Sequence, residues 1–434
     1  MDKMADVLGR AGAWCGQNKY LSAIKNAFQN FMPLTIAGAI GVLWCNVLVN
    51  DQTGLGLFFK PIMALDFLNP AFQAVNFCTI SCITVGITLG IAQEIGVWNM
   101  GAERAGYIPG LVGLAAWLSV TNTSHMVEGA KEAFTGIAGN ELGATGLFTG
   151  MIIGVLSVEL FCFFEKQDAL KIKMPEQVPP GVARAFEVLV PATITLIITA
   201  CIGSACYNLT GLYLNDVIKN GIQGPLGAVG ATIPGVMIIY LVIMLFWLVG
   251  IHGNNMLSAV KEALFTPLAL ENVEKFNKGE KPTNIINMYA LQMWGEFGGS
   301  GVTIGLVIAI MIFGKREDNK AIATLSLVPG LFNINETVTF GVPMVLNPIL
   351  GIPFVVAPLI TIIIGYVLTV IGFCPVACLT VPWTTPPIVF GFLATVANVM
   401  GAVTQAILIV VSTVIYVPFL ISYEKYQNKQ AAEA

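Results

Sequence analysis

The feature that most constrains this chain is a run from residue 337 to residue 423 that contains no charged side chain. Because about 20 apolar residues cross the hydrocarbon core of a bilayer as a helix, this run is long enough for several crossings. Only 11% of the whole sequence is charged, whereas an ordinary soluble domain carries about 25%. The sequence therefore predicts an all-α integral membrane protein, since helices satisfy their own backbone hydrogen bonds inside lipid.

Further charge-free runs mark the other predicted spans. They cover residues 26–50, 67–93, 105–127, 142–158, 188–215, 220–260, 282–295, 297–314 and 321–335. Basic residues concentrate in 1–25, 165–187 and 261–281, and this alternation favours a cytoplasmic N-terminus. The segment 315–320 and the C-terminal tail are also expected in the cytoplasm. Reconciling them with the other loops requires a re-entrant element or broken helices between residues 250 and 350.

Two regions predict departures from simple spans. Residues 250–350 are rich in glycine and proline, and broken helices at membrane depth commonly build the substrate site of a transporter. In 207–225 apolar and polar residues alternate, which is typical of an amphipathic interfacial helix. We place the domain boundary there, with an N-terminal transmembrane domain at 1–220 and a C-terminal one at 221–434. The charged, proline-containing segment 165–187 is the alternative boundary.

Glu336 stands out because charged side chains at membrane depth are costly and are therefore functional candidates. It is the only charged residue between Lys320 and Glu424, and polar neighbours in 333–339 could satisfy it. A loop carboxylate at the water interface is the alternative interpretation. The apolar sequence on both sides of Glu336 favours a site.

His252 and Glu296 are two further candidates. His252 lies between two glycines at the end of a charge-free span, and two amides follow it, so we interpret it as a site residue rather than a packed structural histidine. Glu296 lies in a glycine-rich segment and could instead be a charge at the membrane edge. The amides predicted to join the site are Asn254, Asn255 and Asn335, and the predicted aromatic contacts are Trp247 and Trp383.

This set of side chains suits a neutral polyol. Carboxylates and amides bind hydroxyl groups in fixed directions, and aromatic faces cover the apolar face of a sugar ring. The region has no arginine cluster for an anionic substrate. With two histidines and no Cys-x-x-Cys pair, neither a metal nor a cofactor is predicted. A net charge of −4 gives no reason to expect a nucleic-acid partner.

Three motifs resemble those of a known family. They are Gly-Ile-His-Gly-Asn-Asn at 250–255, Asn-Glu-Thr-Val-Thr-Phe-Gly-Val-Pro at 335–343 and Val-Pro-Trp-Thr-Thr-Pro-Pro at 381–387. Together they are similar to the membrane (C) component of phosphotransferase-system sugar transporters of the lactose/cellobiose/diacetylchitobiose family, and most similar to its diacetylchitobiose type. The likeness extends over essentially the whole chain.

The resemblance implies a homodimer of about ten transmembrane helices with re-entrant hairpins, in the bacterial cytoplasmic membrane. The first five spans would form much of the dimer interface, and the later half would hold a β-linked disaccharide of the diacetylchitobiose or cellobiose type. A phosphocysteine on a separate B protein, supplied by an A component, would phosphorylate the 6-hydroxyl of the sugar. His252 and Glu336 match the positions expected beside that hydroxyl. The chain would carry no phosphoryl group itself.

Other functions remain open from the sequence. A proton-coupled sugar symporter would use Glu336 as its coupling group and need no partner protein. An intramembrane enzyme would use Glu336 and His252 to turn over a substrate alone, but the chain has no His-Glu-x-x-His, Gly-x-Ser-x-Gly or P-loop motif. A scaffold protein would bind no sugar at all. Which disaccharide is carried depends on side chains outside the three motifs.

Overall fold

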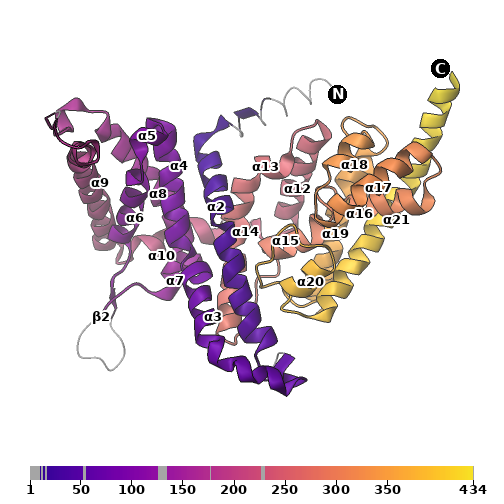
Figure 1. Ribbon diagram of the computed structural model, residues 1–434, viewed down its shortest axis with the longest axis horizontal. Helices are drawn as coiled ribbons and strands as arrows, with labels where there is room; N and C mark the ends of the chain where they lie inside the picture. Colours follow the sequence, from indigo (N-terminus) through magenta and orange to yellow (C-terminus); the bar gives the residue numbers. More distant parts are fainter. Residues whose placement is uncertain are drawn as a thin grey trace. The chain divides into compact units, whose positions relative to one another are not determined.

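The computed structural model describes residues 10, 13–14, 17–51, 55–125, 134–175, 177–225 and 230–433. Within these residues the chain is almost entirely helical (Figure 1), and its only strands are an antiparallel pair, Ser124–His125 (β1) and Phe134–Thr135 (β2). The prediction of an all-α fold is therefore confirmed.

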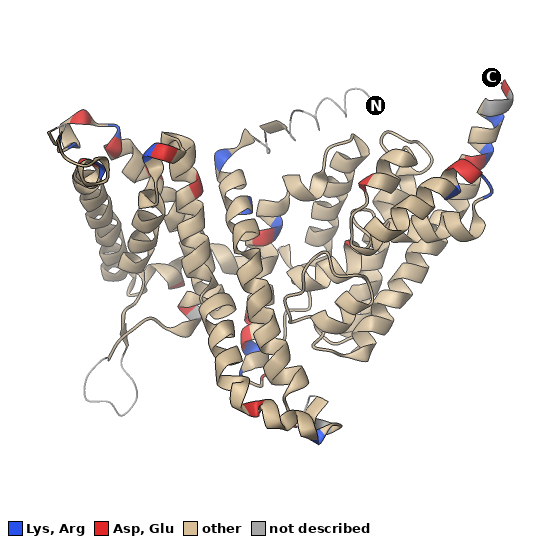
Figure 2. Ribbon diagram, in the orientation of Figure 1, with Lys and Arg blue, Asp and Glu red and all other residues tan. Residues whose placement is uncertain are grey.

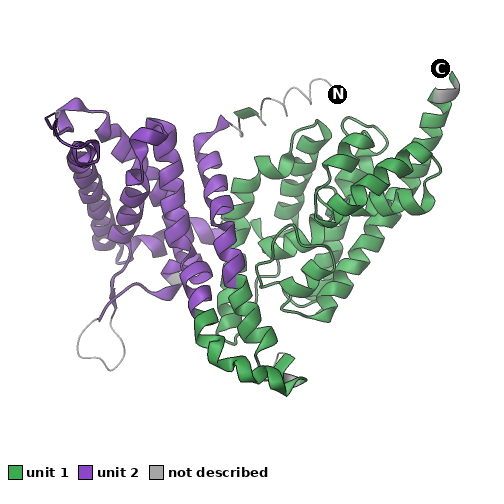
Figure 3. Ribbon diagram, in the orientation of Figure 1, with its two compact units in different colours: residues 1–16, 39–73, 229–434 green, residues 17–38, 74–228 purple. Residues whose placement is uncertain are grey.

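The chain forms two compact units (Figure 3). Unit 1 comprises the described residues within 1–16, 39–73 and 229–434, and unit 2 comprises those within 17–38 and 74–228. Helix α2 (Lys19–Leu43) begins in unit 2 and ends in unit 1. The predicted division into domains 1–220 and 221–434 stays a prediction.

Unit 2 is built around α4 (Ile83–Met100), α6 (Ile108–Val120), α8 (Ala144–Glu165) and α9 (Pro180–Thr210). Small residues let the helices approach closely, since a Cβ atom on Gly150 would lie only 2.9 Å from Cγ2 of Thr84. Trp117 and Ile153 pack in the core between these helices. The shorter elements are η4 (Phe77–Ser81), α5 (Ala102–Ala105), α7 (Gly139–Leu142), η5 (Asp168–Leu170), α10 (Leu214–Ile218) and η6 (Lys219–Gln223). The helix α3 (Asn69–Asn76) runs from unit 1 into unit 2.

Unit 1 contains the C-terminal half of the chain, where the site residues were predicted. Its helices are α12 (Ile233–Leu248), α13 (Gly253–Met256), α14 (Ser258–Asn277), α15 (Met288–Gly295), α16 (Ile304–Phe313), α17 (Glu317–Leu331), α18 (Glu336–Gly341), α19 (Gly351–Val370), α20 (Val389–Ala394) and α21 (Val399–Glu433). The short segments η1 (Trp44–Leu48), η2 (Leu55–Leu57) and η3 (Lys60–Leu68) also belong to it. Helix α21 packs along α16, α19 and α20.

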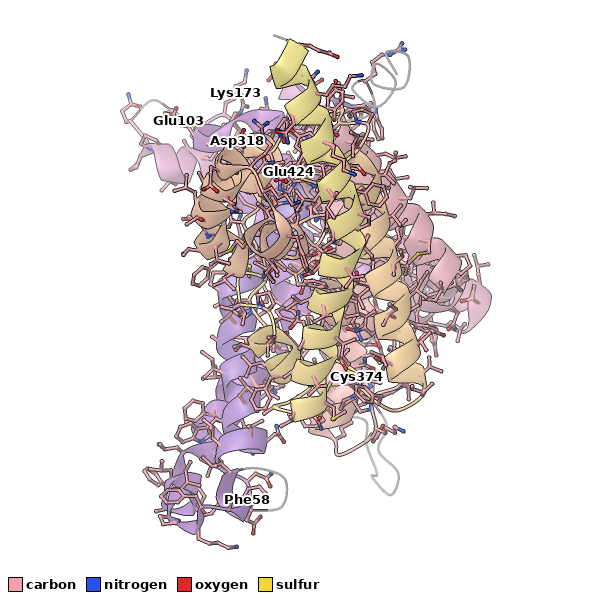
Figure 4. All side chains as sticks on the ribbon, turned by 90° about the vertical axis from the view of Figure 1, so that its right-hand side faces the viewer. Phe58, Glu103, Lys173, Asp318, Cys374 and Glu424 are labelled. Carbon is pink, nitrogen blue, oxygen red and sulfur yellow. The ribbon has the colours of Figure 1, made fainter. Side chains whose placement is uncertain are left out.

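Five of the described helices are long and apolar enough to cross a membrane, namely Lys19–Leu48, α8, α9, α19 and Val399–Gln430. A pair bent by 42°, Lys60–Ser81 with Ile83–Met100, would add a sixth, and α6, α12 and α16 are shorter apolar helices. Figure 2 shows that the charged residues of α21 gather at its C-terminal end. Figure 4 places Asp318 and Glu424 at one end of unit 1 and Cys374 nearer its other end.

Two helices differ from the segments that predicted them. Helix α9 begins at Pro180, before the charge-free run, because proline suits the first position of a helix. Arg184 in this added part pairs with Glu165 at 2.9 Å and with Glu187 at 2.8 Å. The segment 207–225 divides at Gly211. Helix α9 continues to Thr210, Gly211 ends it with a left-handed φ of 72°, and α10 and η6 then form one continuous helical stretch from Leu214 to Gln223, where the interfacial helix was expected.

The broken helices predicted between residues 250 and 350 are present. Helix α15 ends at Gly295 and α16 starts at Ile304, and the turn between them bends through glycines with left-handed φ angles. Val302 in this turn also has a φ of 48°, which is costly for a β-branched residue. By contrast, the predicted polar loop 261–281 is mostly the helix α14, and Lys261 is buried.

Candidate functional site

His252 is fixed at the start of the short helix α13. Helix α12 ends at Leu248, and Gly250 then turns the chain with a left-handed φ of 82°. The Nδ1 atom of His252 accepts the backbone N–H of Asn255 at 3.2 Å. In a neutral imidazole with Nδ1 as the acceptor, the proton is on Nε2. The ring of Trp247 lies 4.4 Å from the imidazole, centroid to centroid, and supports it from one face.

Glu336 is the first residue of α18 and faces His252. Its Oε1 atom lies 3.9 Å from Nε2 of His252, and the two side chains are 49% and 38% exposed. This distance is longer than a direct hydrogen bond, but a hydroxyl oxygen can lie about 2.8 Å from both atoms at once. The arrangement therefore provides an acceptor and a donor for one hydroxyl group.

Asn333 joins three segments that lie far apart in the sequence. Its Oδ1 atom accepts the backbone N–H of Gly298 at 2.6 Å, and its Nδ2 donates to the carbonyl oxygens of Trp383 and Thr385. The residue has a left-handed φ of 62°, which asparagine tolerates better than most side chains. Asn333 thus fixes the start of the loop that leads to Glu336.

Asn335 attaches the residue before Glu336 to the glycine-rich turn. Its Nδ2 donates to the carbonyl oxygen of Ser300 at 2.7 Å. A Cβ atom on Gly299 would lie 2.6 Å from Cγ of Asn335, so only glycine allows this approach. The turn between α15 and α16 therefore supports the segment that carries Glu336.

A buried polar network lies in the same unit and runs from Tyr240 to Ser300. The hydroxyl of Tyr240 donates to Oε1 of Glu296 at 2.6 Å, and the ammonium of Lys261 pairs with the same oxygen. Lys261 also donates to Oδ1 of Asn254 at 3.2 Å, and Nδ2 of Asn254 donates to Oγ of Ser300 at 2.8 Å. The network compensates the charge of the buried Lys261 and of the largely covered Glu296, which would otherwise be costly in a low-dielectric interior.

The structure brings several of the predicted site residues together. His252 faces Glu336, and Glu296 is connected to Asn254 through Lys261.

The remaining predicted residues do not share one role. Trp247 is buried beneath the imidazole, Trp383 is 45% exposed and binds Asn333 through its carbonyl, and Asn255 contacts His252 through its backbone. Within the described part of the chain, no three His, Cys, Asp or Glu side chains gather as metal ligands would.

Lys261 and Tyr240 are two polar groups of this region that the sequence does not identify as site residues. Lys261 begins a polar stretch with three further lysines, a pattern that predicts a loop. One signal was available, because Lys261 lies seven residues after Asn254 in the sequence, which is about two turns of helix. Tyr240 gave no signal, since it lies within a long apolar run.

A family model described as "Phosphotransferase system, EIIC" matches residues 25–358 of the chain. Trp247, His252 and Glu336 lie inside the matched range. The match covers more than half of the sequence.

Curated proteins and a solved structure are similar over nearly the whole chain. The oligo-beta-mannoside-specific EIIC component of Bacillus subtilis (strain 168) is 32% identical, over 98% of this chain and 94% of that protein. The cellobiose-specific EIIC component of Lactococcus lactis subsp. lactis (strain IL1403) is 30% identical, over 98% of each. The crystal structure of ChbC, the IIC component of an N,N'-diacetylchitobiose-specific phosphotransferase system, superposes with a TM-score of 0.87 at 29% identity, over 97% of each chain.

Proposed function

The chain belongs to the EIIC family of the phosphotransferase system, and we propose that it carries a β-linked disaccharide of the cellobiose or diacetylchitobiose type across the bacterial cytoplasmic membrane. In this proposal it presents the 6-hydroxyl of the sugar to a phosphocysteine on a separate B protein, to which an A component supplies the phosphoryl group. The names of the similar proteins support a β-linked substrate.

The observation that carries the proposal is the pair of His252 and Glu336. Both groups are partly exposed and 3.9 Å apart, while Lys261 and Glu296 in the same unit are paired with each other and much less exposed. Phosphoryl transfer depends mainly on positioning and charge stabilisation, and a positioned acid–base group contributes about 10²–10⁴-fold. An exposed acceptor beside an exposed imidazole meets this requirement for one hydroxyl.

The proposed transfer step exchanges one bond to phosphorus for another. The 6-oxygen of the sugar attacks the phosphorus, the new O–P bond forms, and the S–P bond to the cysteine of the B protein breaks. The hydroxyl proton passes to Glu336, while the Nε2–H of His252 donates a hydrogen bond to the same oxygen, and the cysteine leaves as a thiolate. No residue of this chain carries the phosphoryl group in this scheme.

We place both chain termini in the cytoplasm and expect a homodimer through the N-terminal domain 1–220. The basic residues of 1–25, 165–187 and 315–320 support this orientation. The domain 221–434 would then hold the sugar together with the residues that face its 6-hydroxyl.

The test is a phosphotransfer assay on purified protein in vesicles with a panel of β-linked disaccharides. The wild type should form sugar 6-phosphate only when the phosphorylated B protein is present. Glu336→Gln and His252→Ala should lower the turnover at saturating sugar by about 10²-fold or more. Glu317→Gln, an exposed carboxylate on α17, is the matched control and should leave turnover unchanged.

Two outcomes would overturn the proposal. Sugar uptake driven by a pH gradient without any phosphocarrier would identify a proton-coupled symporter that uses Glu336. Normal sugar binding and normal transfer in both site variants would place the chemistry elsewhere in the chain.

A further inference from the structure

Lys261 is a buried lysine that the transfer of a phosphoryl group does not itself require. It lies in the first turn of α14 and is 5% exposed. An ammonium group in such a place must be compensated, because removal of a charge from water costs several kcal/mol. Its contacts are Glu296, Oδ1 of Asn254 at 3.2 Å and the ring of Tyr240, whose centroid lies 5.6 Å away.

The contact with Asn254 fixes the direction of that amide. Lys261 binds its oxygen, and its Nδ2 donates to Oγ of Ser300 at 2.8 Å. Rotating the amide would exchange donor and acceptor and break both bonds. Asn254 lies in the helix α13, which His252 caps, so Lys261 also anchors the helix that holds the imidazole.

The contact with Glu296 occupies only one oxygen of the carboxylate. Lys261 and Tyr240 both bind Oε1. Among the described residues, no group donates to Oε2, and the side chain of Glu296 is 17% exposed. The pair therefore leaves one oriented carboxylate oxygen, which can accept a hydrogen bond from a ligand.

We propose that Lys261 is a positioning residue for sugar binding, which holds Glu296 so that its free oxygen accepts a hydrogen bond from a sugar hydroxyl or acetamido N–H. Lys261 acts through Glu296 and Asn254 and does not touch the sugar. This inference rests on the proposed function and adds a specificity element to it. The expected ligand is an uncharged sugar with a donor group at this position.

The charged neighbours of the pair allow this role. Glu262, on the same helix, is bound by the hydroxyl of Thr266 and does not compete for the ammonium of Lys261. His252 and Glu336 face each other at 3.9 Å and take no part in the contact between Lys261 and Glu296. The pair is connected to the exposed site through Asn254 of α13, the helix that His252 caps, and it replaces neither member of that site.

The alternative is that Lys261 and Glu296 form a purely structural ion pair. Removing one partner of a buried pair leaves an uncompensated charge and is strongly destabilising, whereas removing both is often nearly neutral. A structural pair would therefore regain stability and sugar affinity together when both charges are removed. A positioning pair would regain stability only, because the oriented carboxylate is lost.

The experiment compares Lys261→Met, Glu296→Gln and the double variant with wild type. Lys275→Met is the matched control, because Lys275 lies on the same helix and, among the described residues, its ammonium binds Glu271 and Thr283 but no residue of the site. The measurements are the Kd for cellobiose and N,N'-diacetylchitobiose, the thermal midpoint, and KM and kcat with the phosphorylated B protein. The Kd values are measured without the B protein, so they test the role of Lys261 whether or not phosphotransfer occurs.

We expect Lys261→Met and the double variant to raise Kd and KM about tenfold or more, which corresponds to about 1.4 kcal/mol. The kcat at saturating sugar should stay within about twofold of wild type, because Glu336 and His252 are unchanged. The double variant should recover the thermal midpoint of wild type but not its affinity for the sugar. If Lys261→Met does not fold, the double variant alone decides the question. Wild-type Kd values in the double variant would overturn the inference. Absence of sugar phosphate with wild type would instead refute the proposed function.

Discussion

Asn333 illustrates how single amide side chains hold this site in place. Its three hydrogen bonds reach Gly298, Trp383 and Thr385, and its backbone adopts the left-handed region. Each bond contributes on the order of 1 kcal/mol to stability. Asn333 lies three residues before Glu336, so its hydrogen bonds restrict the position of the backbone segment that carries this carboxylate.

We predict that Asn333→Ala and Asn333→Gly both lower the rate of sugar phosphorylation, because the loop that positions the carboxylate of Glu336 is no longer held in place. Glycine removes the side-chain bonds but keeps the left-handed backbone at no cost, and alanine also adds about 1–2 kcal/mol of backbone strain. Chemical denaturation should therefore rank wild type above Asn333→Gly and Asn333→Ala last. Wild-type turnover in both variants would show that the amide does not position Glu336.

The residues that the sequence identified share a physical reason. His252 and Glu336 were recognisable because each interrupts a long apolar stretch, where a titratable group is costly. Lys261 was not, because Lys275, Lys278 and Lys281 follow it in the same polar stretch. Whether a lysine in such a stretch points inwards depends on the rotation of α14, and its partner Glu296 lies 35 residues away.

Among the helices, α21 shows that a membrane-spanning element can also carry a cap for its neighbour. Gln405 lies within it and is 1% exposed. Its Oε1 atom accepts the backbone N–H groups of Ile388 at 2.8 Å and Gly391 at 2.7 Å, and its Nε2 donates to the carbonyl oxygen of Met293 at 3.2 Å. The start of α20 and the end of α15 are thereby attached to α21.

We predict that Gln405→Leu destabilises the protein by about 1–3 kcal/mol, because buried backbone N–H groups lose their acceptor. Val410→Ala is the matched control on the same helix, since Val410 is 62% exposed and should change the thermal midpoint little. The measurement is the thermal midpoint in a fixed detergent. Equal midpoints for the two variants would contradict the capping role.

Element bounds were predictable only where charge or proline marks them. The charge-free run 142–158 overlaps most of α8, which ends at Glu165, and Glu296 marks the break between α15 and α16. The charge-free run 337–423 gave no internal bounds, although it contains α19, α20 and much of α21. A helix that is apolar on all sides has no polar face from which its rotation or its ends can be inferred.

For the molecule as a whole, the charges of unit 1 indicate how that unit lies in the membrane. Glu424 accepts hydrogen bonds from the backbone N–H groups of Lys315 at 2.9 Å and Arg316 at 3.3 Å. The start of the charged segment 315–320 and the charged end of α21 therefore lie together. Figure 4 places Asp318 and Glu424 at one end of unit 1 and Phe58 at the opposite end. These two ends should therefore face opposite sides of the membrane.

We predict that Lys320→Cys reacts with a membrane-impermeant maleimide only from the cytoplasmic side, and Phe58→Cys only from the outside. Lys320 is charged and partly exposed, and Phe58 is 85% exposed. Labelling of intact cells and of inverted vesicles distinguishes the two sides, with wild type as the control for its own cysteines. Labelling of both positions from one side would contradict the proposed orientation.

The polar network between Tyr240 and Ser300 also has a thermodynamic consequence. Its carboxylate, ammonium and amide groups bind one another. Side chains that are ordered beforehand lose little rotamer entropy on association, which otherwise costs about 0.5–1.5 kcal/mol for each immobilised group. Calorimetry of sugar binding should accordingly find that this part of the protein contributes little unfavourable conformational entropy.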